Sequence, residues 1–79
     1  MVTVRYFAGA RAAAGVAEED VAAGTLGELK QCLRAGRDRR FAAILAASSL
    51  MSDGRPLGND ETVLADRTTV EVLPPFAGG

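Results

Sequence analysis

Two stretches of alternating apolar and polar residues, one near each end of the chain, limit the fold more than any other feature. Each places apolar side chains at every second position, as a strand does when one face of its sheet is buried. The stretches are residues 2–7 and 68–73, with inward positions Val2, Val4, Tyr6, Val70 and Val72. A helix between them can supply the crossover that parallel strands require. We therefore predict that the two strands are adjacent, parallel and central in one sheet.

A capping box predicts the first helix. In Thr25-Leu26-Gly27-Glu28, the Thr25 hydroxyl can accept from the Glu28 amide, and the Glu28 carboxylate can accept from the Thr25 amide. The helix that follows has an apolar stripe, on which Cys32 is expected to be buried instead of serving a redox or sulfur-relay role. The stripe consists of Leu26, Leu29, Cys32 and Leu33.

A second, short helix is predicted after a break. Gly36 can take the left-handed conformation that ends the first helix, and Asp38 can cap the start of the next. The inner face of this helix consists of Phe41, Ile44 and Leu45. Three arginines at its beginning are expected to form a solvated surface, namely Arg37, Arg39 and Arg40.

The remaining segments predict shorter elements. Residues 16–23 predict a weak strand whose acidic centre suits an exposed sheet edge. Residues 49–52 predict another strand, followed by a strong turn signal at Asp53-Gly54. Residues 8–15 fit either a loop or a short helical turn.

The element order predicts an α+β domain. It has a mixed sheet of four to five strands, packed against one main helix plus a short second helix. Val63 and Leu64 are expected to pack on its core from a short turn.

Composition excludes several classes of function. The 79 residues suffice for one domain, and the net charge of −1 predicts binding neither to nucleic acid nor to a membrane. With no histidine and one cysteine, the chain can form neither a His-based catalytic triad nor a metal cluster. The lone cysteine, without a signal-peptide pattern, predicts a cytoplasmic protein. A stand-alone enzyme is not expected, although carboxylate or lysine chemistry stays open.

The end of the sequence combines a rigid part with a thin one. Pro74 and Pro75 fix the backbone φ angle and form a semi-rigid stalk. Gly78 and Gly79 lack a Cβ atom, so the end of the chain is slim. Such an end can carry a carboxylate into another protein's active site, although fraying is also common at chain ends. We expect Gly79 to bear the free carboxylate.

Three segments carry a family resemblance: Tyr6-Phe7-Ala8-Gly9-Ala10-Arg11, Asp53-Gly54 and Leu73-Pro74-Pro75-Phe76-Ala77-Gly78-Gly79. Together they resemble the ubiquitin-like sulfur carriers of the molybdopterin synthase small-subunit type (MoaD/ThiS type). The resemblance implies a β-grasp (ubiquitin-like) domain over residues 1–75 and a mobile tail over residues 76–79. The chain departs from the family at Asp66-Arg67-Thr68, where many members have Asp-Gly-Asp, and at Phe76, where many have valine.

The resemblance also implies chemistry at Gly79 that partner proteins carry out. An E1-like adenylyltransferase activates the Gly79 carboxyl with ATP and magnesium, and a sulfur donor converts the acyl-adenylate to a thiocarboxylate. The large subunit of molybdopterin synthase, expected in a heterotetramer with this chain, then uses the sulfur to form the molybdopterin dithiolene. The chain itself is expected to bind no cofactor and no metal.

Further residues are assigned to tail access and to partner binding. Ala77 and Gly78 keep the approach to Gly79 narrow. Phe76 anchors the tail to a partner, unless it packs back on its own domain. Phe7 joins an apolar docking patch or packs in the core, and Arg11 pairs with an acidic group of the activating enzyme or is solvated. The predicted partner-binding residues are Phe7, Arg11, Pro74, Pro75 and Phe76.

Three alternatives stay open on the sequence. The chain can be a sulfur carrier for cysteine or thiamine-thiazole synthesis, a ubiquitin-like modifier conjugated through Gly79, or an interaction module with an idle tail. A thiocarboxylate product indicates a carrier, and an isopeptide product indicates a modifier. Lys30 is the only lysine, so self-linked chains can use only that side chain or the N-terminus.

Overall fold

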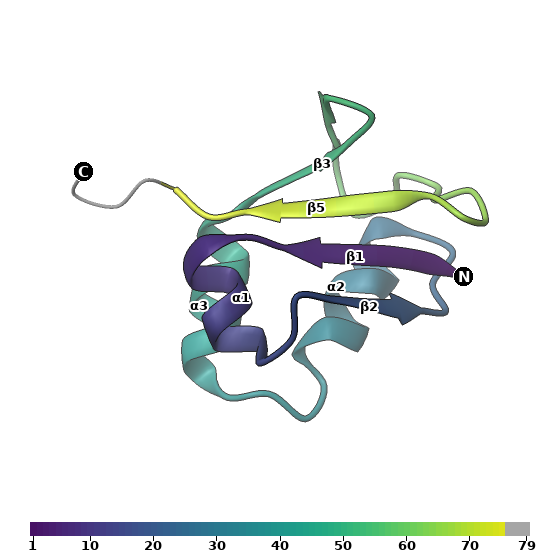
Figure 1. The fold of residues 1–79 in the computed structure, drawn as a ribbon. Helices are drawn as coiled ribbons and strands as arrows, with labels where there is room; N and C mark the ends of the chain where they lie inside the picture. Colours follow the sequence, from purple (N-terminus) through teal and green to yellow (C-terminus); the bar gives the residue numbers. More distant parts are fainter. Residues whose placement is uncertain (76–79) are drawn as a thin grey trace.

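The computed structural model describes residues 1–75, so the predictions for residues 76–79 (Phe76, Ala77, Gly78 and Gly79) lie outside the described residues. The described part forms five strands and three helices (Figure 1). In chain order they are β1 (Val2–Tyr6), α1 (Ala8–Ala14), β2 (Glu18–Val21), α2 (Leu26–Arg34), α3 (Arg39–Ala47), β3 (Ser49–Ser52), β4 (Arg55–Pro56) and β5 (Thr69–Leu73).

The two ends of the chain form the centre of a mixed sheet. The strand order is β2-β1-β5-β3-β4, with β1 and β5 parallel and the other neighbours antiparallel. Figure 1 shows β1 and β5 side by side, with α2 behind the sheet. The predicted parallel pair is confirmed, and Val4 on β1 is the register partner of Val70 on β5. This arrangement is the β-grasp fold that the sequence predicted.

One face of the sheet packs against the helices. Alternate residues of β1 and β5 are almost fully buried there, namely Val2, Val4, Tyr6, Val70 and Val72. Leu64 is buried as predicted, but Val63 is 78% exposed, so the prediction for Val63 was wrong. Val63 forms an isolated bridge with Thr25. Neighbouring residues of an extended segment point to opposite sides, so only one of the two can face the core.

The predicted capping box begins α2. The Glu28 amide donates to the Thr25 hydroxyl at 3.2 Å, and the Thr25 amide donates to the Glu28 carboxylate at 3.2 Å. Three leucines bury the inner face of the helix, namely Leu26, Leu29 and Leu33. Cys32 is exposed, so its predicted burial was wrong. At 3.6 residues per turn, Cys32 lies about a quarter turn from the centre of the leucine stripe.

The other two helices extend the prediction. Asp38 caps α3 by accepting from the Phe41 amide at 3.0 Å, and Phe41 and Leu45 are buried. With nine residues, α3 is as long as α2 and is not the shorter helix that the sequence predicted. Residues 8–14 form a third helix, α1, which settles the choice between a loop and a helical turn. Its first residue, Ala8, has a backbone φ angle of 48°, a value that residues other than glycine rarely adopt.

A charged cluster joins β1, β2 and the loop between α2 and α3. The Glu19 carboxylate accepts from Arg37 at 2.7 Å and from the Tyr6 hydroxyl at 2.5 Å. The Arg37 guanidinium also lies 4.8 Å from the centre of the Phe41 ring. Glu19 and Arg37 therefore hold parts of the fold together. The prediction that the acidic run and the arginine cluster are solvated was wrong for these two residues. Burial, and then the bond to Glu19, raise the pKa of Tyr6 above the ordinary tyrosine value.

Candidate functional site

The segment that leads to Gly79 leaves the sheet from its central strand. Leu73, the last residue of β5, is the register partner of Ser49 on β3. Pro74 and Pro75 follow directly, the first half-buried and the second exposed. Because proline has no amide hydrogen, neither residue can donate to a ladder hydrogen bond, and the strand ends there. Pro74 and Pro75, the predicted stalk, therefore lie at the end of the middle strand of the sheet, at one edge of the domain.

Phe7 lies beside this exit. Its amide donates to the Val72 carbonyl at 3.2 Å, because β1 and β5 are parallel and end at the same side of the domain. The Phe7 side chain is half-buried and is not part of the buried core. The Arg5 guanidinium lies 5.5 Å from the centre of its ring. Phe7 therefore lies beside the base of the tail and outside the buried core, and its part in a docking patch stays a prediction.

Arg11 lies one helical turn further along α1. Its amide donates to the Phe7 carbonyl at 3.3 Å, so the backbone of α1 fixes its position relative to Phe7. Its side chain is exposed, and within residues 1–75 it forms no ion pair. The Arg11 guanidinium is therefore available to an acidic group of another protein. That such a pair forms stays a prediction.

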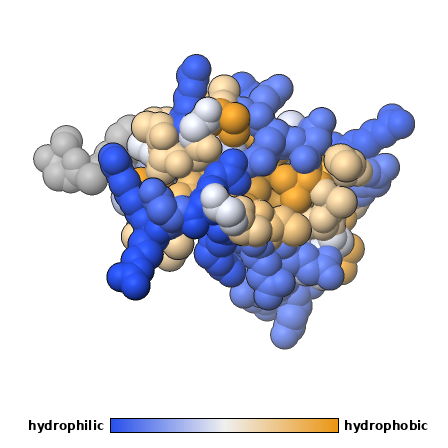
Figure 2. Space-filling view, turned by 90° about the horizontal axis from the view of Figure 1, so that it is seen from below, coloured by the Kyte–Doolittle hydropathy of each residue, from blue (hydrophilic) through white to orange (hydrophobic). Residues whose placement is uncertain are grey.

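The sheet face opposite the helices carries one row of side chains that the sequence analysis missed. The register places these residues side by side across all five strands, namely Glu18, Arg5, Glu71, Met51 and Pro56. Register partners project to the same face of a sheet. The alternation of the predicted strands indicated which residues point outward, but it did not indicate the register that places these residues side by side. Figure 2 looks from below, at the side where β2 lies in Figure 1 and not at this open face, and there hydrophobic residues are interrupted by hydrophilic ones.

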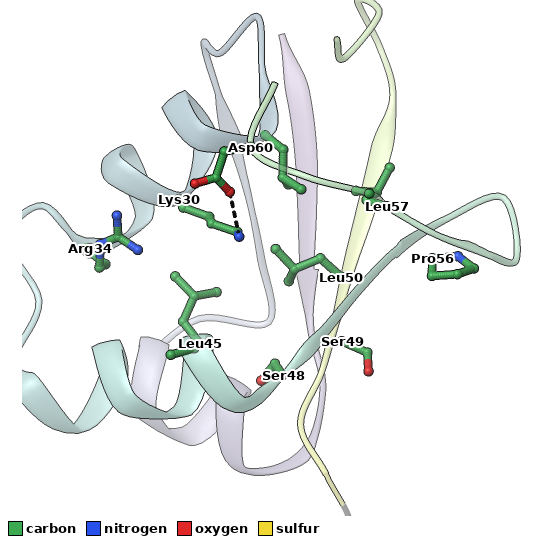
Figure 3. Close-up of a pocket in the computed structure, with 12 residues that line it drawn as sticks. Lys30, Arg34, Leu45, Ser48, Ser49, Leu50, Pro56, Leu57 and Asp60 are labelled. Carbon is green, nitrogen blue, oxygen red and sulfur yellow. Dashed lines mark hydrogen bonds and ion pairs between the residues drawn. The ribbon is translucent and has the colours of Figure 1, made fainter. Parts of the chain in front are cut away.

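A pocket of about 440 Å³ lies between α2, α3 and the β3–β4 segment (Figure 3). Leucines line its floor, and the Lys30 ammonium pairs with Asp60 at 2.8 Å on its wall. The Ser48 hydroxyl donates to the Ile44 carbonyl at 2.6 Å. Lys30 and Ser48 are therefore both engaged with other groups of the chain.

Two further observations apply to residues 1–75. No group of three or more histidine, cysteine, aspartate or glutamate side chains in this range is arranged to hold a metal ion. None of its helices has the length and apolar character needed to cross a membrane.

Sequence comparison identifies the family. The pattern of the ThiS family matches residues 4–79, which is nearly the whole chain. The chain belongs to the ThiS family. Its members are ubiquitin-like sulfur carriers, so the resemblance stated from the sequence is confirmed at this level. The sequence has no match among curated proteins.

Solved structures share the fold of this ThiS-family chain. Small archaeal modifier protein 1 (SAMP1) from Methanosarcina acetivorans has a TM-score of 0.82 and 23% identity, covering 99% of this chain and 95% of that one. A chain in the BexX/CysO complex of Amycolatopsis orientalis has a TM-score of 0.80 and 19% identity, and the match covers 100% of both chains. A chain in the complex of subunits 1 and 2 of the molybdopterin-converting factor from Helicobacter pylori has a TM-score of 0.74 and 24% identity, and the match covers 99% of this chain and 97% of that one. At these identities the likeness establishes the fold alone.

Proposed function

We propose that this ThiS-family chain is the small subunit of a molybdopterin synthase and carries sulfur as a thiocarboxylate on Gly79. One observation supports this most. The central strand β5 runs directly into Pro74 and Pro75, at the edge where Phe7 follows β1. Two prolines directly after a strand that is paired on both sides give the tail a semi-rigid base on the domain.

The proposed chemistry begins from a poor electrophile. A chain-terminal carboxyl has a pKa of about 3.3–3.7, so Gly79 is ionised at neutral pH. Its oxygen attacks the α-phosphorus of ATP, which releases pyrophosphate and leaves an acyl-adenylate. Hydrosulfide from a sulfur donor then attacks the acyl carbon: a C–S bond forms, the C–O bond to AMP breaks, AMP leaves with a proton released, and Gly79 ends in a thiocarboxylate. ATP and magnesium belong to the E1-like activating enzyme, and this chain supplies only the acyl group.

The structure supports a role for partner proteins in every step. Phe7, Pro74 and Pro75 stand together at the exit of the tail, where a partner can contact all of them. We propose that Phe76 anchors the tail in the partner, that Ala77 and Gly78 fit its narrow approach, and that Arg11 pairs with an acidic group there.

We propose two partners, the activating enzyme and the large synthase subunit, the latter in a heterotetramer. That a related fold occurs in a two-subunit complex in Helicobacter pylori supports the second partner. We also propose that the protein acts in the cytoplasm, where a lone exposed cysteine stays reduced.

Genetic complementation tests the pathway. The gene is expressed in cells that lack their own molybdopterin synthase small subunit, and molybdopterin is measured. We expect the wild-type chain to restore synthesis and Gly79→Ala to fail. If a thiocarboxylate forms on Gly79 without rescue, the chain is a carrier for another pathway, such as cysteine or thiamine-thiazole synthesis. If Gly79 is instead found joined to lysines of other proteins, the chain is a modifier and the proposal is wrong.

A further inference from the structure

Glu71 lies at the centre of the sheet face that the helices leave open. It belongs to β5, the middle strand, and its register partners are Arg5 on β1 and Met51 on β3. Its sequence neighbours Val70 and Val72 are both fully buried on the opposite face. The Glu71 side chain is therefore held on the open face, where it is half-buried.

The Glu71 carboxylate has no ionic or hydrogen-bonding partner within residues 1–75. Its neighbour Arg5 is engaged elsewhere, because its Nε lies 3.8 Å from Glu18 and its guanidinium lies over the Phe7 ring. By contrast, the half-buried Glu19 on β2 has two donors. No buried polar side-chain atom of residues 1–75 lacks a partner, so water still reaches the Glu71 carboxylate. Because no protein group in this range binds it, the carboxylate is available to a donor of another molecule.

Apolar side chains border Glu71 on two sides. Met51 lies next to it on β3, and Leu73 lies two residues further along β5 on the same face; both are half-buried. Leu73 immediately precedes the Pro74–Pro75 exit, so this surface is continuous with the base of the tail. A partner that holds the tail can cover Met51 and Leu73, which would exclude water from the carboxylate and strengthen any ionic contact with it.

We infer that Glu71 receives a cationic side chain of the enzyme that activates Gly79, and that this pair selects that enzyme. The inference rests on the proposed function. An arginine fits best, because its planar guanidinium can donate two parallel hydrogen bonds to one carboxylate. An enzyme with an apolar or acidic residue at this place would bury Glu71 unpaired, which disfavours it as a partner. Glu71 touches no reacting atom and acts only through docking.

Pyrophosphate exchange into ATP tests the inference, with the E1-like adenylating enzyme of the cells that make this protein. The carrier concentration is varied, so that KM and kcat are obtained separately for wild type, Glu71→Gln and Glu71→Lys. We expect KM to rise about tenfold for Glu71→Gln and about a hundredfold for Glu71→Lys, with kcat changed by less than about twofold. Added salt should raise the KM of the wild type more than that of Glu71→Gln.

Glu61 provides the matched control. It is an exposed glutamate in the loop before β5, where only its backbone amide forms a hydrogen bond, to the Asn59 side chain. Glu61→Gln and Glu61→Lys make the same changes in net charge, and their KM should stay within about threefold of the wild type. Thermal unfolding of all four variants verifies that each chain is folded.

The outcomes separate the inference from the proposed function. If the wild type exchanges pyrophosphate and the Glu71 variants behave like the Glu61 variants, the inference is overturned and the carrier function stands. A loss in kcat without a change in KM would also overturn it, because docking would then not be the affected step. If the wild type gives no exchange, both the proposed function and this inference are wrong.

Discussion

Tyr6 provides the sharpest test of the folded core, because its hydroxyl is tied to a charged partner. The side chain is 3% exposed, and its hydroxyl donates to Glu19 at 2.5 Å. A hydrogen bond to a charged acceptor contributes about 1.5–3 kcal/mol. In Tyr6→Phe, Glu19 keeps Arg37, and its side chain is 29% exposed to water. We therefore expect the lower value, a loss of about 1.5 kcal/mol in the free energy of unfolding at neutral pH.

The same bond predicts a specific dependence on alkaline pH. The pKa of Tyr6 is raised in the folded state, first by burial and then by Glu19, so folding favours the neutral phenol. This contribution is complete below the unfolded pKa of about 10 and is lost as pH rises toward the folded pKa. Linkage gives a loss that grows from a fraction of a kcal/mol at about pH 10 to about 1 kcal/mol at about pH 11. Tyr6→Phe lacks this loss, so the difference in stability between the two proteins should narrow as pH rises over this range.

Urea unfolding of wild type and Tyr6→Phe across this pH range measures the difference. All other ionisable groups are the same in both proteins, so their contributions to the difference cancel. Tyr6 is the only tyrosine and the chain has no tryptophan, so ultraviolet absorbance of the phenolate reports on Tyr6 alone. The reasoning is refuted if the phenolate appears at about pH 10 while circular dichroism shows a folded protein. A stability gap that does not narrow with pH would refute it equally.

Three further predictions concern the backbone and the tail. Gly79→Ala should fold like the wild type but lose adenylation, measured by pyrophosphate exchange; unchanged exchange would contradict the role of a thin tail. Gly27→Ala should lower the free energy of unfolding in urea by about 1 kcal/mol, because its Cβ would lie 3.0 Å from the Cβ and 3.1 Å from the carbonyl oxygen of Asp60; a crowding cost of about 2 kcal/mol then exceeds the gain of about 1 kcal/mol in helix propensity. Ala8→Val should lower the free energy of unfolding by about 1–2 kcal/mol, because Ala8 has a positive φ angle. Ala8→Gly should change it by less than about 0.5 kcal/mol. If urea unfolding gives the same free energy for the two variants, this prediction is wrong.

Much of the fold was predictable because its strongest signals are local. The alternation at Val2–Tyr6 and Thr69–Leu73, the Thr25 capping box and the Asp53-Gly54 turn all act within a few residues, and each is present. Asp53 and Gly54 both have positive φ angles, as a two-residue hairpin of type I′ requires. Parallel pairing of the end strands then followed from the helix between them.

The errors arose where distant parts of the chain meet. Arg37 belongs to a basic run and Glu19 to an acidic one, and nothing local indicates that the two runs pair across 18 residues. The placement of Cys32 failed for a different reason, since a stripe of four apolar residues is wider than the face that the sheet can cover. The stalk at Pro74 and Pro75 was predictable, but the position of Glu71 between Arg5 and Met51 depends on strand register, which the sequence alone does not specify.

The central claim is that Gly79 becomes a thiocarboxylate, and intact mass spectrometry tests it most directly. The chain is incubated with its E1-like adenylating enzyme, ATP, magnesium and a sulfur donor, with a reaction lacking ATP as the control. We expect a mass increase equal to the replacement of one oxygen by one sulfur, located at Gly79 by fragmentation and absent without ATP. An unchanged mass, with pyrophosphate exchange proving that the enzyme is active on the chain, would contradict the sulfur-carrier account.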